Sequence, residues 1–364
     1  MTDRKGVTPP RARELGLAWG DMEPGALDKI TDVPGVTVGH ATVHEGDVHT
    51  GVTVVLPGGG NPFARKLVAA SYVHNGFGKS CGLVQIDELG LIETPIALTN
   101  TLCVGRVADA LVGHVLDQCA QDGTEALSIS PVVGECNDSD INDIRTRTLG
   151  RGDLDRAIAG ACRDFAEGSV GAGTATRCFG LKGGIGSASR VVRLGDEAYT
   201  VGVLVQSNYG STEDLVLGGV PLGRRILEEQ RRAEAAGAEA AAVSHEDRGS
   251  IMTVVATDLP VSSRQLKRIV RRAGVGIART GAYTGHGSGE VMIGFSTANR
   301  VDVRDDAPVR TCRVMAEQHI NLAFKAVAEA THEAIVNSML ASPATRALDG
   351  RTFHSLSEYV PRLL

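Results

Sequence analysis

Alternating and β-branched hydrophobic positions recur along the chain and predict β-strands. The first two runs cover residues 33–43 and 50–56, and the proline- and glycine-rich residues 57–62 follow as a turn. Residues 188–194 and 199–206 have the same character and are close enough in sequence to form neighbouring strands. Further strands are predicted at residues 94–99, 127–133, 250–257 and 290–296.

Apolar residues at helical spacing predict helices between these strands. One of them has Asp153 as its expected N-cap. Ser262 and Ser263 cap another helix, which should stop at Gly274. Because strands alternate with helices and no segment repeats, the fold class is α/β or α+β. The helix capped by Asp153 should cover residues 153–165, and two further helices are predicted at residues 104–117 and 314–340.

Three segments lack this periodicity and are expected to lie outside the main elements. Residues 1–24 are polar and contain prolines, which is typical of a surface arm. Residues 168–186 hold seven glycines and should be largely loop. Residues 223–248 are rich in Ala, Glu and Arg, and we expect a solvated helix that fades into a linker.

Composition limits the class of protein. The chain has 364 residues, 42% of them hydrophobic and 22% charged, which excludes a disordered protein, and length alone favours about two domains. No run approaches the ~20 apolar residues that a membrane span needs. Glycine is in excess, with 45 residues or about 12% against a usual ~7%, which indicates many tight turns and close backbone contacts.

Charge and cysteine usage bear on partners and compartment. The net charge of −6 argues against nucleic acid as the main partner, since such binders usually present a basic surface. The seven cysteines are scattered without a C-x-x-C pair, which is typical of reduced thiols. The N-terminal residues lack the apolar stretch of a secretory signal, so a cytoplasmic protein is expected.

The glycine-rich and histidine-bearing segments do not match a phosphate or metal motif. Residues 78–80 (GKS) resemble the end of a P-loop, but Val73 stands where that motif needs glycine. His40 and His44 lie in a strand-like stretch, where residues four apart are too distant to share one metal ion.

The junction Gly249-Ser250 joins the polar segment to a buried strand and is the main candidate for chemistry. A serine hydroxyl can attack the preceding carbonyl where the backbone is strained, and glycine lets that carbonyl tilt without a Cβ clash. Hydrolysis of the resulting ester would leave Ser250 as a new N-terminus, whose α-amine, with an ordinary pKa of about 7.7–8.0, suits a general base. An ordinary loop end is the alternative interpretation. Neither Ser250 nor Ser288 lies in the G-x-S-x-G sequence of α/β-hydrolases.

A series of motifs runs in order from ITDVPGVTVGH (residues 30–40) to the predicted C-terminal long helix. It includes TGVTVVLP (50–57), HNGFGKS (74–80), TPIALTNTLCVG (94–105), PVVGECND (131–138), GLKGGIGSASR (180–190), VGVLVQSNYG (201–210), RGSIMTVVATDLP (248–260) and GHGSGE (285–290). In these motifs the sequence resembles the DmpA family of peptidases, also called the L-aminopeptidase/D-esterase or β-peptidyl aminopeptidase family.

This resemblance implies an α+β fold, a four-layer αββα sandwich like that of N-terminal-nucleophile hydrolases but with the strand connectivity of DmpA and ornithine acetyltransferase. It implies one domain over residues 1–364, in place of two. Cleavage between Gly249 and Ser250 would divide it into an α chain (residues 1–249) and a β chain (residues 250–364). It also implies a homo-oligomer of αβ units, with a tetramer favoured, and no metal or cofactor.

The resemblance assigns roles to individual residues. Ser250 matches the nucleophile, and Ser288 and Glu290 match the pair that hydrogen-bonds and orients it and supports proton transfer. Their i, i+2 spacing on an extended segment puts both side chains on one face. Asn208 matches the amide that stabilises the oxyanion, and Glu135 matches the acid that holds the free amino group of the substrate. On the residues alone, the last four also have plain interpretations as turn, loop or strand-end residues.

The expected function is a self-processing serine aminopeptidase that releases N-terminal α- or β-amino acids from short peptides, amides and esters through an acyl-enzyme on Ser250. One alternative is an amidase acting on non-peptide ω-amino-acid oligomers, and another is a catalytically silent, uncleaved binding protein. Small-molecule substrates, and neither nucleic acid nor membrane, are the expected partners. Ser139 and Asp140 stand where the family pattern has glycine and an aromatic residue, so a relative's substrate preference does not transfer.

Overall fold

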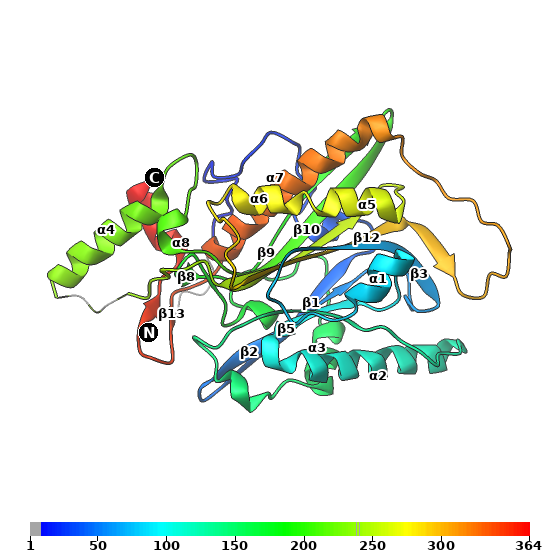
Figure 1. Ribbon diagram of the computed structural model, residues 1–364, viewed down its shortest axis with the longest axis horizontal. Coiled ribbons are helices and arrows are strands. Elements are labelled where there is room, and N and C mark those ends of the chain that lie inside the picture. The colour runs from blue at the N-terminus through cyan, green and yellow to red at the C-terminus, as the bar shows by residue number, and fades with distance from the viewer. Residues whose placement is uncertain (1–8, 238, 240) are drawn as a thin grey trace.

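Two stacked β-sheets with helices on both outer faces form the computed structural model, which describes residues 9–237, 239 and 241–364 (Figure 1). The first sheet has the order β1 (Thr37–Glu45), β2 (Val48–Leu56), β5 (Ile96–Asn100) and β6 (Val132–Cys136). The second has the order β4 (Leu91–Ile92), β3 (Arg65–Gly76), β12 (Ser288–Asp302), β11 (Gly249–Thr257), β10 (Glu197–Asn208) and β9 (Ile185–Leu194). Short pairs are formed by β7 (Arg177–Cys178) with β8 (Leu181–Lys182) and by β13 (Thr345–Arg346) with β14 (Thr352–Phe353).

Most of the helices cover the two outer faces of the sandwich. The described α-helices are α1 (Leu83–Leu89), α2 (Val104–Asp122), α3 (Arg151–Ala159), α4 (Leu222–Ala235), α5 (Ser263–Val270), α6 (Ala273–Ala278), α7 (Ile320–Leu340) and α8 (Leu356–Leu363). Helices α2 and α3 cover the first sheet, and α5, α6 and α7 cover the second (Figure 1). This is the four-layer αββα sandwich that the sequence predicts.

The alternation of side chains along the strands explains how the layers pack against one another. Along β11, Met252 and Val254 point into the core between the sheets, whereas Ile251 and Val255 point toward the outer helices. Both faces of a central strand are buried here, so the run reads as continuously apolar. The same alternation on β12 directs Ile293 inward. An aliphatic core of this kind suits a chain with few aromatic residues.

Helix α7 approaches the second sheet closely because small residues line the contact. A Cβ built on Gly186 of β9 would lie 2.0 Å from the carbonyl oxygen of Ala334, so any larger residue would push the helix away. The helix begins at Ile320, six residues later than predicted, and from Ala326 to Leu340 all its residues are buried. It therefore lacks the exposed face that a one-sided apolar stripe predicts.

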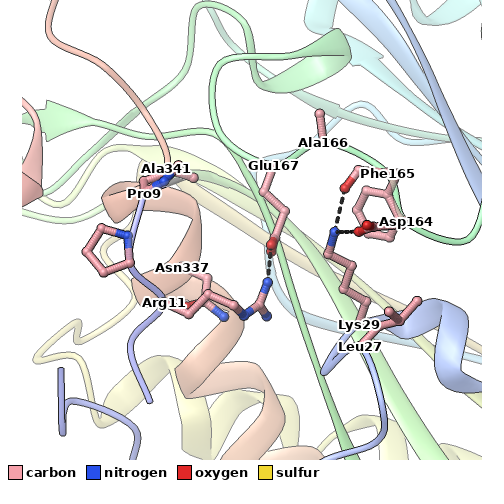
Figure 2. A pocket seen from close by; sticks show the side chains of 11 residues that line it. Pro9, Arg11, Leu27, Lys29, Asp164, Phe165, Ala166, Glu167, Asn337 and Ala341 are labelled. Atoms are coloured by element: carbon pink, nitrogen blue, oxygen red, sulfur yellow. Dashed lines mark hydrogen bonds and ion pairs between the residues drawn. The ribbon is translucent and has the colours of Figure 1, made fainter. Parts of the chain in front are cut away.

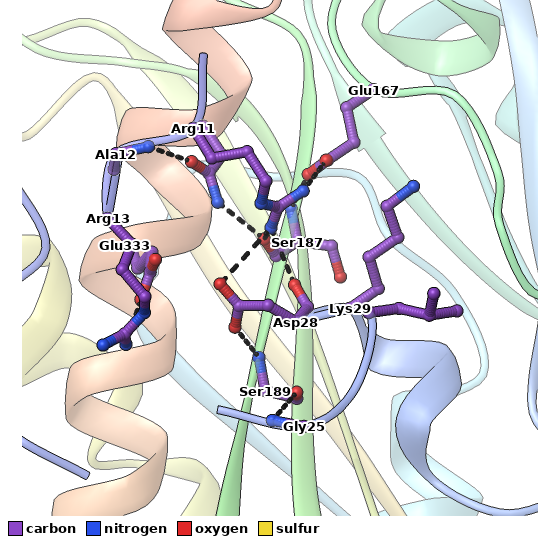
Figure 3. A network of polar contacts seen from close by, with 12 residues as sticks. Arg11, Ala12, Arg13, Gly25, Asp28, Lys29, Glu167, Ser187, Ser189 and Glu333 are labelled. Carbon is purple, nitrogen blue, oxygen red and sulfur yellow. Dashed lines mark hydrogen bonds and ion pairs between the residues drawn. The ribbon is translucent and has the colours of Figure 1, made fainter. Parts of the chain in front are cut away.

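The segment predicted as an N-terminal surface arm is partly wrong: residues 1–8 lie outside the described residues, but from residue 9 onward the segment is tied down. Arg11 pairs with Glu167 and donates to the carbonyl oxygens of Asp28 (2.7 Å) and Ser187 (2.8 Å), as Figure 3 shows. The next residue, Ala12, is fully buried. These contacts fasten the segment to β9.

A buried ion cluster lies beneath this segment, between β9 and α7. The fully buried Arg190 contacts Glu329 (3.1 Å), Glu333 (2.6 Å) and Asp28 (3.5 Å). Burial, together with the negative charge of Glu333, raises the pKa of Asp28 to about 7. Arg190 is the fully buried cation of the cluster, and Arg11, Arg13 and Lys325 pair with the same carboxylates from its partly exposed edge.

Several predicted boundaries are wrong for local reasons. Asp153 is not the N-cap of α3: Gly150 is, and the Asp153 carboxylate accepts a hydrogen bond from the Gly150 amide (2.9 Å). Gly274 does not stop a helix, because α5 already ends at Val270 and Gly274 lies within α6. Residues 127–131 precede the strand β6, which begins at Val132.

The polar segment at residues 223–248 matches its prediction only at first. Helix α4 carries many charged residues, as expected, but Ile226 and Gln230 on it are buried. The end predicted as a linker returns to the core, since Ala242, Ser244 and Asp247 are buried as well. The chain thus enters the Gly249-Ser250 junction from a packed segment.

Candidate active site

The Gly249-Ser250 junction opens β11, in the middle of the second sheet. Ser250 pairs with Asn208 of the antiparallel neighbour β10 and with Gly289 of the parallel neighbour β12. Gly249 has φ +120°, and a Cβ on it would lie 1.9 Å from the Asn208 carbonyl oxygen. Only glycine tolerates both constraints, so the residue before the serine is fixed by geometry.

A cavity of about 290 Å³ lies beside this junction. The predicted residues Glu135, Asn208, Gly249 and Ser250 all line it, although they come from three different strands. Ser250 is 4% exposed, so its side chain is shielded from bulk water but borders the cavity. The other lining residues are Phe77, Lys79, Thr101, Asn137, Ser139, Asp140, Arg177, Arg248 and Gly287.

Glu135 stands at the end of β6 with its carboxylate held from two sides. Its Oε1 accepts a hydrogen bond from the Lys79 amide (2.8 Å), and its Oε2 accepts one from the Thr101 hydroxyl. A carboxylate has about four lone-pair positions, so these two bonds orient the group and leave capacity for another donor. A substrate ammonium in the cavity is a donor of the right charge.

The Asn208 amide is oriented by two backbone partners. Its Oδ1 accepts from the Arg177 amide (3.0 Å), and its Nδ2 donates to the Asn137 carbonyl oxygen (2.9 Å). The second N–H of the amide is not needed by these bonds. Nδ2 lies 3.1 Å from the Cβ position built on Gly249, so the amide group is close to the backbone of the junction.

Ser288 and Glu290 contact each other at the start of β12. The Ser288 hydroxyl donates to Glu290 Oε1, as their spacing predicts. Glu290 Oε2 is buried without a hydrogen-bond partner among the described residues. Burial, and secondarily the charge of Asp247, raises the pKa of Glu290 to about 7. A carboxyl that titrates near neutral pH suits proton transfer.

The pleat separates this pair from the Ser250 side chain in the uncut chain. Ser250 pairs with Gly289, so it shares the inner face with Gly289, whereas Ser288 and Glu290 point to the outer face. What lies between them is the backbone at the start of β11. Ser288 and Glu290 can therefore approach the main-chain nitrogen of Ser250, as predicted for this residue. The Ser250 hydroxyl forms no hydrogen bond with Glu290 here.

Sequence reasoning missed several residues that shape the site. The Cys136 thiol lies 3.4 Å from the Ser250 carbonyl oxygen, and burial raises its pKa well above the ordinary value, so it stays a neutral thiol. Thr101 and Lys79 lie within matched motifs, but no spacing rule links them to Glu135. Asp247 is hidden in the polar segment and could be found only from its burial.

A larger cavity of about 690 Å³ lies elsewhere and shares no residue with the site. Figure 2 shows Arg11 directed at Glu167 and Lys29 directed at Asp164 across it. These charges neutralise each other, and no serine, threonine or cysteine lines the cavity. The chemistry-bearing groups are therefore those at the smaller cavity.

Within residues 9–237, 239 and 241–364, no three His, Cys, Asp or Glu side chains are grouped so as to hold a metal ion. In the same part of the chain, no helix combines the length and apolar character needed to cross a bilayer.

Comparison with known proteins places the chain in a family. The model of peptidase family S58 matches residues 28–353. The β-peptidyl aminopeptidase BapA of Sphingosinicella microcystinivorans is 38% identical over 362 residues, covering 95% of this chain and 89% of the relative. The alignment therefore spans most of both chains.

Solved structures agree with this similarity. A β-aminopeptidase from a Burkholderia species superposes with a TM-score of 0.87 at 37% identity, covering 98% of each chain. The L-aminopeptidase D-Ala-esterase/amidase of Ochrobactrum anthropi, described as a serine aminopeptidase with a variant of the Ntn hydrolase fold, gives 0.86 at 32% identity over 97% of each chain. The layered fold, the Gly-Ser junction at the start of β11 and these matches together establish that the chain belongs to peptidase family S58.

Proposed function

We propose that the chain is a self-processing serine aminopeptidase acting on short peptides, amides and esters with a free amino terminus. The observation that carries this proposal is the junction itself: a glycine at φ +120° precedes Ser250 at the start of a central strand, beside a cavity lined by Glu135 and Asn208. The matches to aminopeptidases over nearly the whole chain support it.

Self-cleavage follows from the neighbours of the junction. The Ser250 hydroxyl attacks the Gly249 carbonyl carbon, and the adjacent N–H of Asn208 stabilises the resulting oxyanion. The C–N bond then breaks, and the hydroxyl proton passes to the departing nitrogen. Water hydrolyses the Gly249 ester, which restores the hydroxyl and leaves Ser250 with a free α-amine.

Turnover reuses the same groups. Glu135 holds the substrate ammonium by a charge-assisted hydrogen bond and so places the first carbonyl of the substrate at Ser250. The α-amine takes the hydroxyl proton and returns it to the leaving amine, and water releases the acyl group. The unpartnered Oε2 of Glu290, on the strand that neighbours β11, is an acceptor for this amine. Ser288 keeps Glu290 in place.

Location and assembly complete the proposal. The seven cysteines are all free in the described residues, which supports a reducing compartment such as the cytoplasm. A homo-oligomer of αβ units, with a tetramer favoured, rests on the family resemblance. Size-exclusion chromatography with light scattering measures the assembly directly.

Intact mass spectrometry tests the proposal. We expect two chains, residues 1–249 and 250–364, in place of one 38.0 kDa species. Ser250→Ala should remain whole and inactive. A single uncut species that hydrolyses aminoacyl p-nitroanilides would overturn the mechanism. A panel of β-alanyl, L-alanyl, D-alanyl and 6-aminohexanoyl amides separates an aminopeptidase from an amidase for ω-amino-acid oligomers.

A further inference from the structure

Asp247, three residues before Ser250, connects two loops of the site. Its carboxylate is buried, with the residue 3% exposed. Oδ1 accepts a hydrogen bond from the Gly210 amide (3.0 Å), and Oδ2 accepts one from the Gly285 amide (3.0 Å). The two partners are 37 and 38 residues away in sequence and approach Asp247 from opposite directions along the chain.

These two loops carry the side chains assigned to the chemistry. Gly210 follows Asn208 by two residues at the end of β10, and Gly285 precedes Ser288 by three residues at the start of β12. The contact with the second loop is close, because a Cβ on Gly285 would lie 2.4 Å from the Asp247 carbonyl oxygen. The Asp247 carboxylate therefore fixes the segment that precedes Gly249 relative to β10 and to β12, the two strands that neighbour β11.

Asp247 also acts electrostatically on Glu290. Its negative charge is, after burial, a cause of the raised pKa of Glu290. The charges of Asp247 and Glu290 also act on the Tyr209 hydroxyl, and burial keeps the pKa of Tyr209 well above the ordinary value. Its hydroxyl bonds the Thr280 hydroxyl (2.9 Å), so it remains neutral and leaves Asp247 as the charge that acts on Glu290.

We propose that Asp247 is a positioning residue for self-cleavage, which holds the Gly249 carbonyl between Asn208 and the Ser288–Glu290 pair. This inference rests on the proposed function. Asp247 forms no bond in the reaction: both of its oxygens remain acceptors, and the proton moves from the Ser250 hydroxyl to the Ser250 nitrogen.

The test is the rate of self-cleavage of Asp247→Asn, followed as the appearance of two chains on gels from pH 5 to 9. Asparagine has one acceptor oxygen, so one of the two buried amides loses its partner and the loops separate. We expect cleavage at least tenfold slower than in the wild type. We also expect the acid limb of the rate profile to move to lower pH, because removal of the charge lets Glu290 ionise more readily and the ionised carboxylate stabilises the departing Ser250 amine.

Asp258→Asn is the matched control, since Asp258 follows the other end of β11 and accepts a hydrogen bond from the Thr200 amide (2.6 Å). It should cleave like the wild type. If Asp247→Asn aggregates, Asp247→Glu carries the test: slower cleavage with an unmoved acid limb supports the inference, and wild-type cleavage overturns it. Slow cleavage of Asp247→Asn without a moved limb also overturns it, as packing alone would explain that. A wild-type chain that stays whole would instead refute the proposed function.

Discussion

Ser288 donates its hydroxyl to the carboxylate of Glu290, and the two flank Gly289, the residue that pairs with Ser250 on the neighbouring strand. The pair therefore lies on the face of the sheet opposite to the Ser250 side chain. It is joined to the reaction through the backbone of β11, where cleavage would create an amine.

Glu290→Gln should stabilise the protein at alkaline pH. The folded-state pKa of Glu290 is raised to about 7 from 4.5, so the unfolded chain loses this proton first and stability falls as pH rises from about 4.5 to about 7. In a Ser250→Ala background, which keeps every molecule uncut, Glu290→Gln should add about 2–3 kcal/mol at pH 8 and almost nothing at pH 4. Urea unfolding at both pH values measures this, with the exposed Glu228→Gln as control. An equal effect at both pH values would contradict the assignment.

Gly249→Ala should block self-cleavage. Its Cβ would meet the Asn208 carbonyl oxygen at 1.9 Å, and alanine disfavours φ +120°. We expect the chain to remain a single 38.0 kDa species by mass spectrometry. Gly287→Ala is the control, because its Cβ would meet only the flexible Arg248 side chain at 3.4 Å. Equal cleavage of the two variants would show that the junction geometry does not matter.

Glu135→Gln should lower kcat/KM for substrates with a free amino terminus by 10- to 100-fold, because a charge-assisted hydrogen bond becomes a neutral one. Self-cleavage should continue, since the junction supplies its own carbonyl and no ammonium. Assays with alanyl p-nitroanilide and gels of the purified variant separate the two effects. Glu246→Gln, at an exposed site near the junction, is the control. Unchanged kcat/KM would remove Glu135 from substrate recognition.

Arg190→Met should destabilise the fold by about 3–5 kcal/mol at pH 8, because Glu329 and Glu333 lose their buried counter-charge. Arg193→Met, three residues along β9, breaks an exposed pair with Glu23 and should cost less than about 1 kcal/mol. Urea unfolding of both variants in the Ser250→Ala background gives the comparison. Similar losses for the two arginines would mean that the cluster contributes no more than a surface pair.

Local patterns predicted much of the fold but not its long-range contacts. The strands β9, β10 and β11 and the capping of α5 by Ser262 follow from short stretches of sequence. Strand β3 was missed, because its alternation is irregular and its pairing with β12 joins residues more than 200 positions apart. Helix α8 and the returning end of the polar segment were missed for the same reason: only tertiary packing buries them.

The candidate site shows the same division. Family motifs identified Ser250, Asn208, Ser288, Glu290 and Glu135, and the structure brings the first two and Glu135 to one cavity. Asp247 escaped because an acidic residue among many others in a polar segment has no local mark. Its partners Gly210 and Gly285 are adjacent to it only in the folded chain. The roles of these residues stay predictions until the variants are measured.

Strands β11 and β12 lie inside the second sheet, between β10 on one side and β3 on the other. A cut after Gly249 would leave the middle of this sheet on one polypeptide and both of its borders on another. Each piece would then contribute hydrogen-bonded strands to the same sheet, and the two pieces could separate only by global unfolding. Refolding would also become a bimolecular reaction that slows on dilution. The uncut chain could refold by itself after unfolding, whereas the lifetime of the cleaved protein would depend on how slowly it unfolds.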